Sequence, residues 1–424
     1  MATRYQLARL DNRLQVATAV LPAMQSVTAG VWIAVGGRHE PARLCGISHF
    51  IEHLLFKGTR RRTAKQISQE VEGVGGYLNA FTSEEHTCYF AKASADKLGL
   101  LLDVLLDIYT EPLFAPADLA KEREVIKEEI QMYLDRPDQH VHELLNELLW
   151  PAQPLGRPLT GTLKSMDAIS RRDVLAYKAR HYVSDNTLIA VAGPVEHAAV
   201  TAMAARAASR IRPGRRGRFS PARESRRGPL LRLHAKDTEQ THVALAVHTF
   251  SRYDPRRYAL KLLNVILGEN MSSRLFQAVR EQHGLAYAIS SATSYFADSG
   301  ALVISAGLDN AHLRKALRVI SRELSRLAAK PPSAAELRRA KDFAIGQMRL
   351  SLESTSNQMM WVGEHLIGYG EVLDPDEIVS RLQVVSPDEI QALARSLLRT
   401  PRLRLAVIGP QNDAKAIERE LVVE

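Results

Sequence analysis

The sequence predicts an α+β protein built from two homologous domains, each with a mostly antiparallel sheet packed against α-helices. Three observations support this prediction. Strand-like runs of alternating apolar residues follow one another at hairpin distance. Long amphipathic helical patterns separate these runs. The second half of the chain also repeats elements of the first, and a segment rich in Pro, Gly and Arg lies between the halves.

The first half of the chain alternates strand and helix patterns. In order, these are a strand over 27–35, a helix over 46–56, strands within 77–90, helices over 95–109 and 121–130, a helix over 170–181 and a strand over 188–192. The second half has strands within 287–306, a helix over 310–327, a helix beginning at 386 and a strand over 403–408. Consecutive strands of this kind favour an antiparallel or mixed sheet in each half.

The closing elements of the two halves have the same spacing. Ser170 and Ser386 each precede a helical pattern and have an acid three residues on, which indicates a capping box. Each helix leads to a strand that ends in Gly-Pro, and Gly193 and Gly409 both lie 23 positions after their serine. A repeat of this length indicates duplication of a whole domain rather than a short-repeat array.

The segment between the halves carries the positive charge of the chain. The formal net charge is +9, and residues 206–232 contain ten arginines against one acid. The rest is close to neutral and has no basic stripe with interleaved aromatics, which argues against nucleic-acid binding. Residues 213–229 are predicted to link an N-terminal domain over 1–212 to a C-terminal domain over 230–424.

The composition is that of a globular protein. Of the 424 residues, 46% are hydrophobic and 24% are charged. The two cysteines provide no disulfide framework and fit a reducing compartment. The N-terminus lacks the apolar stretch of a secretory signal, and no run of about 18 apolar residues occurs. We therefore expect a cytoplasmic protein with no membrane partner.

The segment His49-Phe50-Ile51-Glu52-His53 lies within an apolar helical pattern. His49 and His53 are four positions apart, so both imidazoles leave one face of the helix and suit a single zinc ion. Glu52 lies at the edge of that face, where a carboxylate can accept a proton from a water that the metal activates. This H-x-x-E-H order inverts the commoner zincin motif. Chance occurrence of so short a motif is the alternative.

A catalytic zinc site needs a third protein ligand. Residues 121–130 form an acidic helical pattern in which Glu122 and Glu129 are seven apart and share a face. One could bind the metal while the other orients a histidine. Spacing alone does not choose among the four glutamates of this segment, and a solvated helix surface is the alternative.

Taken together, these residues resemble the insulinase/pitrilysin family of zinc peptidases, in particular its shorter members similar to the mitochondrial processing peptidase β subunit and its bacterial relatives. The resemblance covers most of the chain and implies the duplicated fold of that family. It also implies that the glutamate ligand follows the second histidine by about 76 residues, which selects Glu129 as ligand and Glu122 as the additional acid behind a histidine.

The resemblance extends to two candidate substrate-binding segments. Asn79, Ala80 and Phe81 lie in a strand similar to the one that binds peptide in the family, where an edge strand accepts an extended chain. A plain hairpin edge is the alternative. In the second half, Arg280 and Tyr287 resemble the arginine/tyrosine pair that holds the substrate backbone and stabilises the oxyanion.

The resemblance implies a zinc-dependent endopeptidase that acts on unfolded peptides inside a chamber made by two chains, with one zinc ion per chain. Because the chain carries both the motif and the Arg/Tyr pair, the resemblance also implies a homodimer; a heterodimer with a related subunit is the alternative. A non-catalytic scaffold subunit and a catalytic subunit that needs a different partner are the rival functions.

Overall fold

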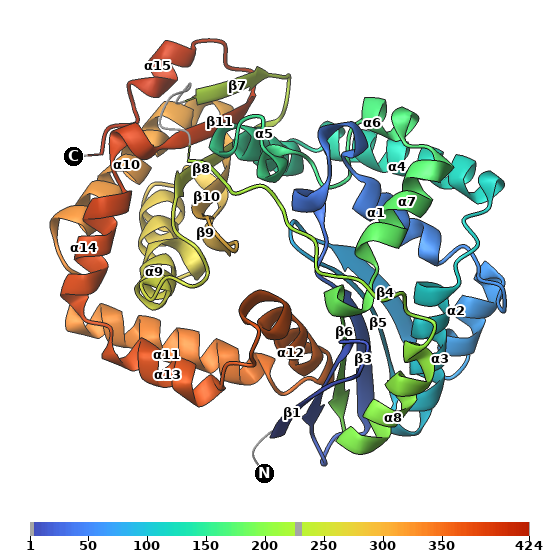
Figure 1. The fold of residues 1–424 in the computed structure, drawn as a ribbon. Coiled ribbons are helices and arrows are strands. Elements are labelled where there is room, and N and C mark those ends of the chain that lie inside the picture. The colour runs from blue at the N-terminus through green and yellow to red at the C-terminus, as the bar shows by residue number, and fades with distance from the viewer. Residues whose placement is uncertain (1–3, 225–230, 424) are drawn as a thin grey trace. The chain divides into compact units, whose positions relative to one another are not determined.

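The computed structural model describes residues 4–224 and 231–423, which form two compact units (Figure 1). Unit 1 contains the described residues of 1–131, 157–220 and 351–373. Unit 2 contains those of 132–156, 221–350 and 374–424. Each unit has one sheet and its own covering helices, so the predicted fold class of two similar α+β domains is confirmed.

Unit 1 consists of β1 (Arg4–Arg9), β2 (Gln15–Val20), β3 (Ser26–Ile33), α1 (Ile47–Leu55), α2 (Ala64–Glu72), β4 (Tyr77–Thr82), β5 (Thr87–Ser94), α3 (Leu98–Thr110), most of α4 (Pro116–Asp135), α6 (Leu163–Ala168), α7 (Arg171–His181), β6 (Thr187–Gly193), α8 (His197–Ala208) and α12 (Thr355–Tyr369). Its strand order is β1-β2-β6-β3-β5-β4, and β2 and β6 are the parallel pair in this otherwise antiparallel sheet.

Unit 2 consists of α5 (Pro137–Leu149), β7 (Leu231–Ala235), β8 (Gln240–His248), α9 (Arg257–Asn264), the π-helical turns η6 (Val265–Glu269) and η7 (Phe276–Gln282), β9 (Ala286–Tyr295), β10 (Gly300–Asp309), α10 (Leu313–Ala329), α11 (Ala334–Ser351), α13 (Pro375–Val384), α14 (Pro387–Leu397), β11 (Arg404–Gly409) and α15 (Ala414–Glu418). Its strand order is β7-β11-β8-β10-β9, with β7 and β11 parallel.

The two sheets correspond strand by strand, as the internal repeat predicts. The run β7-β11-β8-β10-β9 matches β2-β6-β3-β5-β4, including the position of the parallel pair. The predicted capping boxes are also present: the Ser170 hydroxyl accepts from the Asp173 amide, and the Ser386 hydroxyl from the Glu389 amide. The same local signals therefore begin α7 and α14, which each lead into a central strand.

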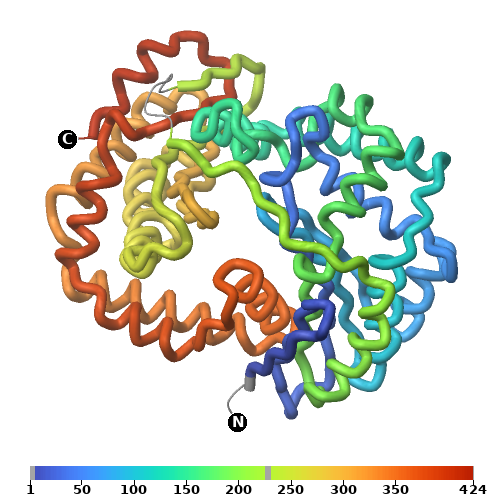
Figure 2. Tube along the Cα trace, viewed as in Figure 1, coloured from blue at the N-terminus to red at the C-terminus, as the bar shows by residue number. Residues whose placement is uncertain are grey.

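The units differ from the predicted domains because two helices are exchanged between the halves of the chain. In unit 2, α5 packs its apolar face on β8 and β11, although it precedes the predicted boundary. In unit 1, α12 covers β2, β3 and β6 although it comes from the second half, as the chain path in Figure 2 also shows. Amphipathic periodicity indicates that a helix buries one face, but it does not say which sheet receives that face.

The predicted linker over 213–229 is only partly described, because residues 225–230 lie outside the described residues. The two units meet in sequence between Ser220 and Pro221, within that linker. The part before this point packs on unit 1: Phe219 lies 3.9 Å from the Arg38 guanidinium carbon, measured from its ring centroid. Among the described residues, no helix is both long and apolar enough to cross a membrane.

Candidate metal centre

The metal-binding motif lies on α1, whose first turn is fixed by the carboxylate of Glu40 in the preceding loop. Gly46 precedes the helix with a φ of 88°, a conformation that favours glycine, and a Cβ there would lie 2.6 Å from the Thr160 carbonyl oxygen. Glu40 Oε2 accepts a hydrogen bond from the Gly46 amide at 2.7 Å, and Oε1 accepts one from the Ser48 amide at 2.8 Å. Glu40 thus satisfies free amides at the start of the helix.

Apolar packing determines which face of α1 remains for chemistry. Ile47, Phe50, Ile51, Leu54 and Leu55 are buried in the core of unit 1. His49, Glu52 and His53 occupy the rest of the helix surface and are only partly buried. The two imidazole rings, one turn apart, have centroids separated by 4.6 Å. The predicted helical spacing therefore places both histidines side by side.

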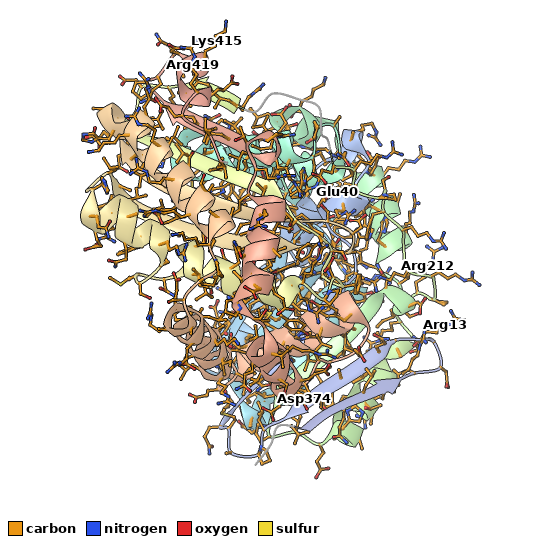
Figure 3. The ribbon with its side chains drawn as sticks, turned by 90° about the vertical axis from the view of Figure 1, so that its left-hand side faces the viewer. Arg13, Glu40, Arg212, Asp374, Lys415 and Arg419 are labelled. Atoms are coloured by element: carbon orange, nitrogen blue, oxygen red, sulfur yellow. The ribbon has the colours of Figure 1, made fainter. Side chains whose placement is uncertain are left out.

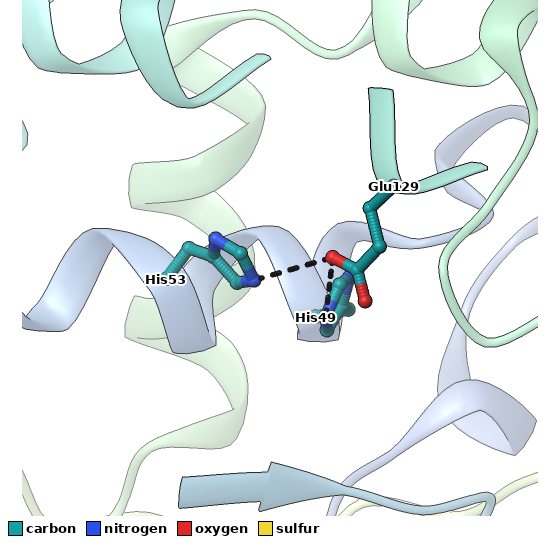
Figure 4. A group of neighbouring side chains, drawn as sticks. All are labelled: His49, His53 and Glu129. Atoms are coloured by element: carbon teal, nitrogen blue, oxygen red, sulfur yellow. Dashed lines mark ion pairs between the residues drawn. The ribbon is translucent and has the colours of Figure 1, made fainter. Parts of the chain in front are cut away.

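Glu129 on α4 completes a group of three ligand atoms. Its Oε2 lies 3.7 Å from His49 Nε2 and 3.7 Å from His53 Nε2 (Figure 4). All three ligand atoms lie within 4.8 Å of one another. Tetrahedral zinc with bonds of about 2.0–2.1 Å has ligand atoms about 3.3–3.4 Å apart, so a small contraction of this group would fit the ion.

Glu122, two helical turns before Glu129, supports His53 from behind. Its Oε2 lies 3.3 Å from His53 Nδ1, so the imidazole can donate Nδ1–H to it and keep Nε2 free for a metal. The other oxygen of Glu122 pairs with Lys57 Nζ at 2.8 Å. Glu122 is 2% exposed, and Lys57 supplies the cation that a buried carboxylate needs. Sequence reasoning missed Lys57, although it lies only four residues after His53, in the turn that follows α1.

The donor set suits a zinc ion chemically. Burial, with the charge of His53, lowers the pKa of His49 to about 4, so its imidazole is neutral at pH 7 and available as a ligand. Among the described residues, His49 Nδ1 is buried without a hydrogen-bond partner. Burial raises the pKa of Glu129, which a bound cation would reverse. Neutral imidazoles with one carboxylate make up a typical catalytic zinc set.

Glu52 is held by a strand of the sheet. The hydroxyl of Thr82, at the end of β4, donates to Glu52 Oε2 at 2.5 Å. Burial raises the pKa of Glu52, while the Thr82 hydrogen bond and His53 oppose the rise. A carboxylate with a raised pKa is a stronger proton acceptor near neutral pH. Thr82 was not predicted as a functional residue, because its contact with Glu52 spans thirty positions of sequence.

The candidate substrate strand β4 lies at an edge of its sheet, where it pairs with β5 alone. Side chains alternate along it, so Ala80 and Thr82 share the face towards Glu52 while Asn79 and Phe81 share the opposite face. Phe81 packs edge-on against Trp32 with centroids 5.6 Å apart. The predicted edge strand with Asn79, Ala80 and Phe81 is therefore present. Phe81 also packs against the hydrophobic core of unit 1.

Arg280 and Tyr287 lie close together in unit 2, on η7 and at the start of β9. The Arg280 guanidinium carbon is 5.9 Å from the centroid of the Tyr287 ring and 4.8 Å from that of Phe276. Tyr287 is 77% exposed. The structure thus brings the predicted pair together, with a tyrosine hydroxyl and a guanidinium available on the surface of unit 2. The other predicted site residues all lie in unit 1.

Comparison with known proteins assigns the chain to a family. The family model described as "Insulinase (Peptidase family M16)" matches residues 15–163, and "Peptidase M16 inactive domain" matches residues 168–343. An "uncharacterized zinc protease" of Mycobacterium leprae is 38% identical over 97% of this chain and 93% of its own length. The chain belongs to the insulinase family of peptidases. A Bacillus subtilis member with the same description is 36% identical over 95% of this chain and 98% of its own length.

Two solved structures share the fold of this chain. A protease from Helicobacter pylori superposes with a TM-score of 0.90 at 21% identity, covering 96% of this chain and all of that one. A protein from Pseudomonas fluorescens, described as a peptidase M16 inactive domain, superposes with a TM-score of 0.88 at 19% identity. The superposition covers 96% of this chain and 98% of that one. The resemblance inferred from the motifs is confirmed, and so is the duplicated fold.

Proposed function

We propose that this member of the insulinase family is a zinc-dependent endopeptidase, with one zinc ion per chain held by His49, His53 and Glu129. The convergence of those three ligand atoms beside Glu52 is the observation that carries the proposal. Among the described residues, this is the only group of three or more side chains placed to bind a metal. The names of the relatives, which describe zinc proteases, support the same metal and reaction.

The reaction follows from the groups around Glu52. When bound, zinc supplies Lewis acidity that polarises a peptide carbonyl and lowers the pKa of a water molecule. Glu52 accepts the proton of the attacking water and then delivers it to the leaving amine. The hydroxyl of Thr82 occupies one oxygen of Glu52, so the other oxygen is left for the water. Glu122, neutralised by Lys57, keeps His53 in the tautomer that exposes Nε2.

The substrate proposed is an unfolded peptide. An edge strand such as β4 offers unpaired backbone groups that an extended chain can join as a further strand. Folded proteins do not offer such a strand freely, so the preference is for unfolded segments. Arg280 and Tyr287 are proposed to hold the substrate backbone and to stabilise the oxyanion of the tetrahedral intermediate.

A Glu52→Gln variant tests the proposal. We expect peptide hydrolysis, followed with a quenched fluorescent peptide, to fall by about 10²–10⁴-fold because the proton acceptor is lost. Zinc content measured by elemental analysis should stay at one ion per chain, because Glu52 is not a ligand. A His49→Ala variant, as control, should lose both zinc and activity. Full activity of Glu52→Gln with normal zinc would exclude the mechanism, and wild-type protein that binds no zinc would favour the scaffold function.

We further propose a cytoplasmic homodimer in which Arg280 and Tyr287 of one chain serve the metal centre of the other. The homodimer would make the purified chain active without a different partner. The two cysteines, both free and buried, are consistent with a reducing compartment.

Mixing two inactive variants tests this assignment. Glu52→Gln is combined with the double variant Arg280→Ala and Tyr287→Phe, and the chains are allowed to re-associate. If each site uses two chains, mixed dimers regain one intact site, and roughly a quarter of wild-type activity returns. If each site is formed within one chain, the mixture stays inactive. Light scattering of the purified chain checks the dimer itself, and a monomer with full activity would contradict it.

A further inference from the structure

A pocket of unit 1 shares no residue with the metal centre. It has a volume of about 310 Å³ and lies between the end of α3, the loop over 111–114, α7 and residues 210–212. Phe114, Leu175 and Ile211 contribute apolar walls. This volume falls at the lower end of the range for small-molecule sites. Nothing in the peptidase reaction uses these residues.

The charges around this pocket are unbalanced. Arg60, Lys178, Arg210 and Arg212 line it, against the single carboxylate of Glu111. Glu111 already pairs with Arg60 at 3.4 Å. Within residues 4–224 and 231–423, the side chains of Lys178, Arg210 and Arg212 have no hydrogen-bond or ion-pair partner. Arg212 is exposed at the periphery of unit 1, as Figure 3 shows.

Lys178 is held against aromatic rings rather than against an anion. Its Nζ lies 5.6 Å from the ring centroid of Tyr109 and 5.8 Å from that of Tyr182, and the two rings stack on each other. Both tyrosine hydroxyls are used elsewhere, in bonds with Thr187 and Tyr89. Burial lowers the pKa of Lys178 to about 8, with Glu111 opposing. The ring faces attract the ammonium group but do not neutralise it, so a bound anion would recover part of the cost of burying it.

We propose that this pocket binds a small phosphate-bearing molecule, with Lys178 and Arg212 as its principal contacts and Arg210 at the rim. Three cations without a partner exceed what one carboxylate ligand neutralises, whereas a phosphate group carries up to two charges at pH 7 and accepts several hydrogen bonds. Arginine presents a planar fork that matches phosphate oxygens, and lysine adds a point charge. The apolar walls leave room for an organic body attached to the phosphate.

Inorganic pyrophosphate is the probe, measured by isothermal titration calorimetry with the full chain at low ionic strength. Lys178→Met and Arg212→Gln should each weaken binding by about 10-fold or more, because each removes a charge-assisted hydrogen bond to the phosphate. Arg172→Gln is the matched control: Arg172 is exposed on the same helix but does not line the pocket, so its variant should bind within about two-fold of wild type. Because Arg212 is exposed, Arg212→Gln should fold normally, so it still tests the proposal if Lys178→Met folds poorly.

Vesicles separate two sources of the phosphate. Phosphatidylcholine vesicles with and without phosphatidic acid are tested for co-sedimentation with the chain. Binding to the phosphatidic acid vesicles that pyrophosphate displaces, and that Lys178→Met removes, would identify a lipid headgroup as the source. Pyrophosphate binding without vesicle binding would identify a free phosphate compound. Absence of pyrophosphate binding, or equal weakening by all three variants, would overturn the proposal. Peptide hydrolysis should be unaffected by Lys178→Met, so this test is independent of the peptidase proposal.

Discussion

The two units have corresponding sheets, but the helix that follows the matched central strand carries different chemistry in each. In unit 2, Asn264 at the end of α9 donates to Glu269 at 2.8 Å and accepts from the Ser291 hydroxyl at 2.7 Å. Glu269 is also paired with Lys261 at 2.5 Å. In unit 1, the corresponding helix α1 brings His49 and His53 towards Glu129.

This difference shows what makes one copy of a duplicated fold a metal site. The polar groups of unit 2 satisfy one another, so the helix needs no further ligand. The ligand atoms of unit 1 converge on a common point, and only His53 has a protein partner on its far nitrogen. Incomplete satisfaction on α1 is therefore the structural sign of a site that a cation completes.

The exchanged helices extend the comparison and give the largest predicted effect. Gly363 on α12 is so close to the sheet of unit 1 that a Cβ would lie 2.0 Å from the ring of Trp32, which is fully buried. Gly363→Ala should therefore lower the free energy of unfolding by about 3 kcal/mol or more through overpacking. Gly346→Ala on α11 is the control, since its Cβ would meet nothing within 4 Å and it should change stability by less than about 1 kcal/mol. Chemical denaturation measures both, and equal effects would show that α12 does not pack tightly on this sheet.

An intermediate effect is expected from the edge strands. Thr82→Val on β4 removes the hydroxyl that holds Glu52, so kcat should fall about 10–100-fold while KM stays nearly constant. Thr82→Ser should retain most activity, because it keeps the hydroxyl. Thr293→Val on β9, the corresponding edge of unit 2, is the matched control and should leave kcat unchanged. If Thr82→Val kept the wild-type kcat, Glu52 would not need the Thr82 hydrogen bond to act as the proton acceptor.

The smallest effect concerns acid stability. His181 in unit 1 is 4% exposed, and burial, with the charge of Arg180, lowers its pKa to about 4. The unfolded chain, with a histidine pKa of about 6.5, therefore binds more protons than the folded chain between pH 6.5 and 4, and stability is lost as pH falls through that window. Relative to wild type, His181→Phe should remove about 1–2 kcal/mol of this loss between pH 7 and 5. Denaturant titrations at both pH values test this prediction. If the two proteins lost the same free energy of unfolding between pH 7 and 5, His181 would not contribute to the acid sensitivity.

The sequence predicted the local parts of the site and fold well. Helical spacing alone placed His49, Glu52 and His53 together, because one turn of helix determines their geometry. Capping signals located the starts of α7 and α14 for the same reason. Glu129 was selected from its neighbours by family resemblance, since its meeting with α1 depends on how two helices pack.

The contacts made by loops, turns and strands could not be predicted. Glu40 caps α1 from the loop before it, Lys57 neutralises Glu122 from the turn after α1, and Thr82 reaches Glu52 from a strand. None of these contacts has a fixed spacing, so no sequence pattern marks them. The exchange of α5 and α12 was not predicted. Both sheets have an apolar face that such a helix can cover, and the order of the elements along the chain places each helix in its own half.

That exchange has a consequence for synthesis on the ribosome. All six strands of the unit 1 sheet have been made once Gly193 is added, but the helix that covers Trp32, Leu188 and Ala190 is completed only at Tyr369. Until then the nascent chain presents an uncovered apolar sheet face, the kind of surface that chaperones bind and that promotes aggregation. The metal-binding half of the protein therefore cannot finish folding before most of the other half has been translated.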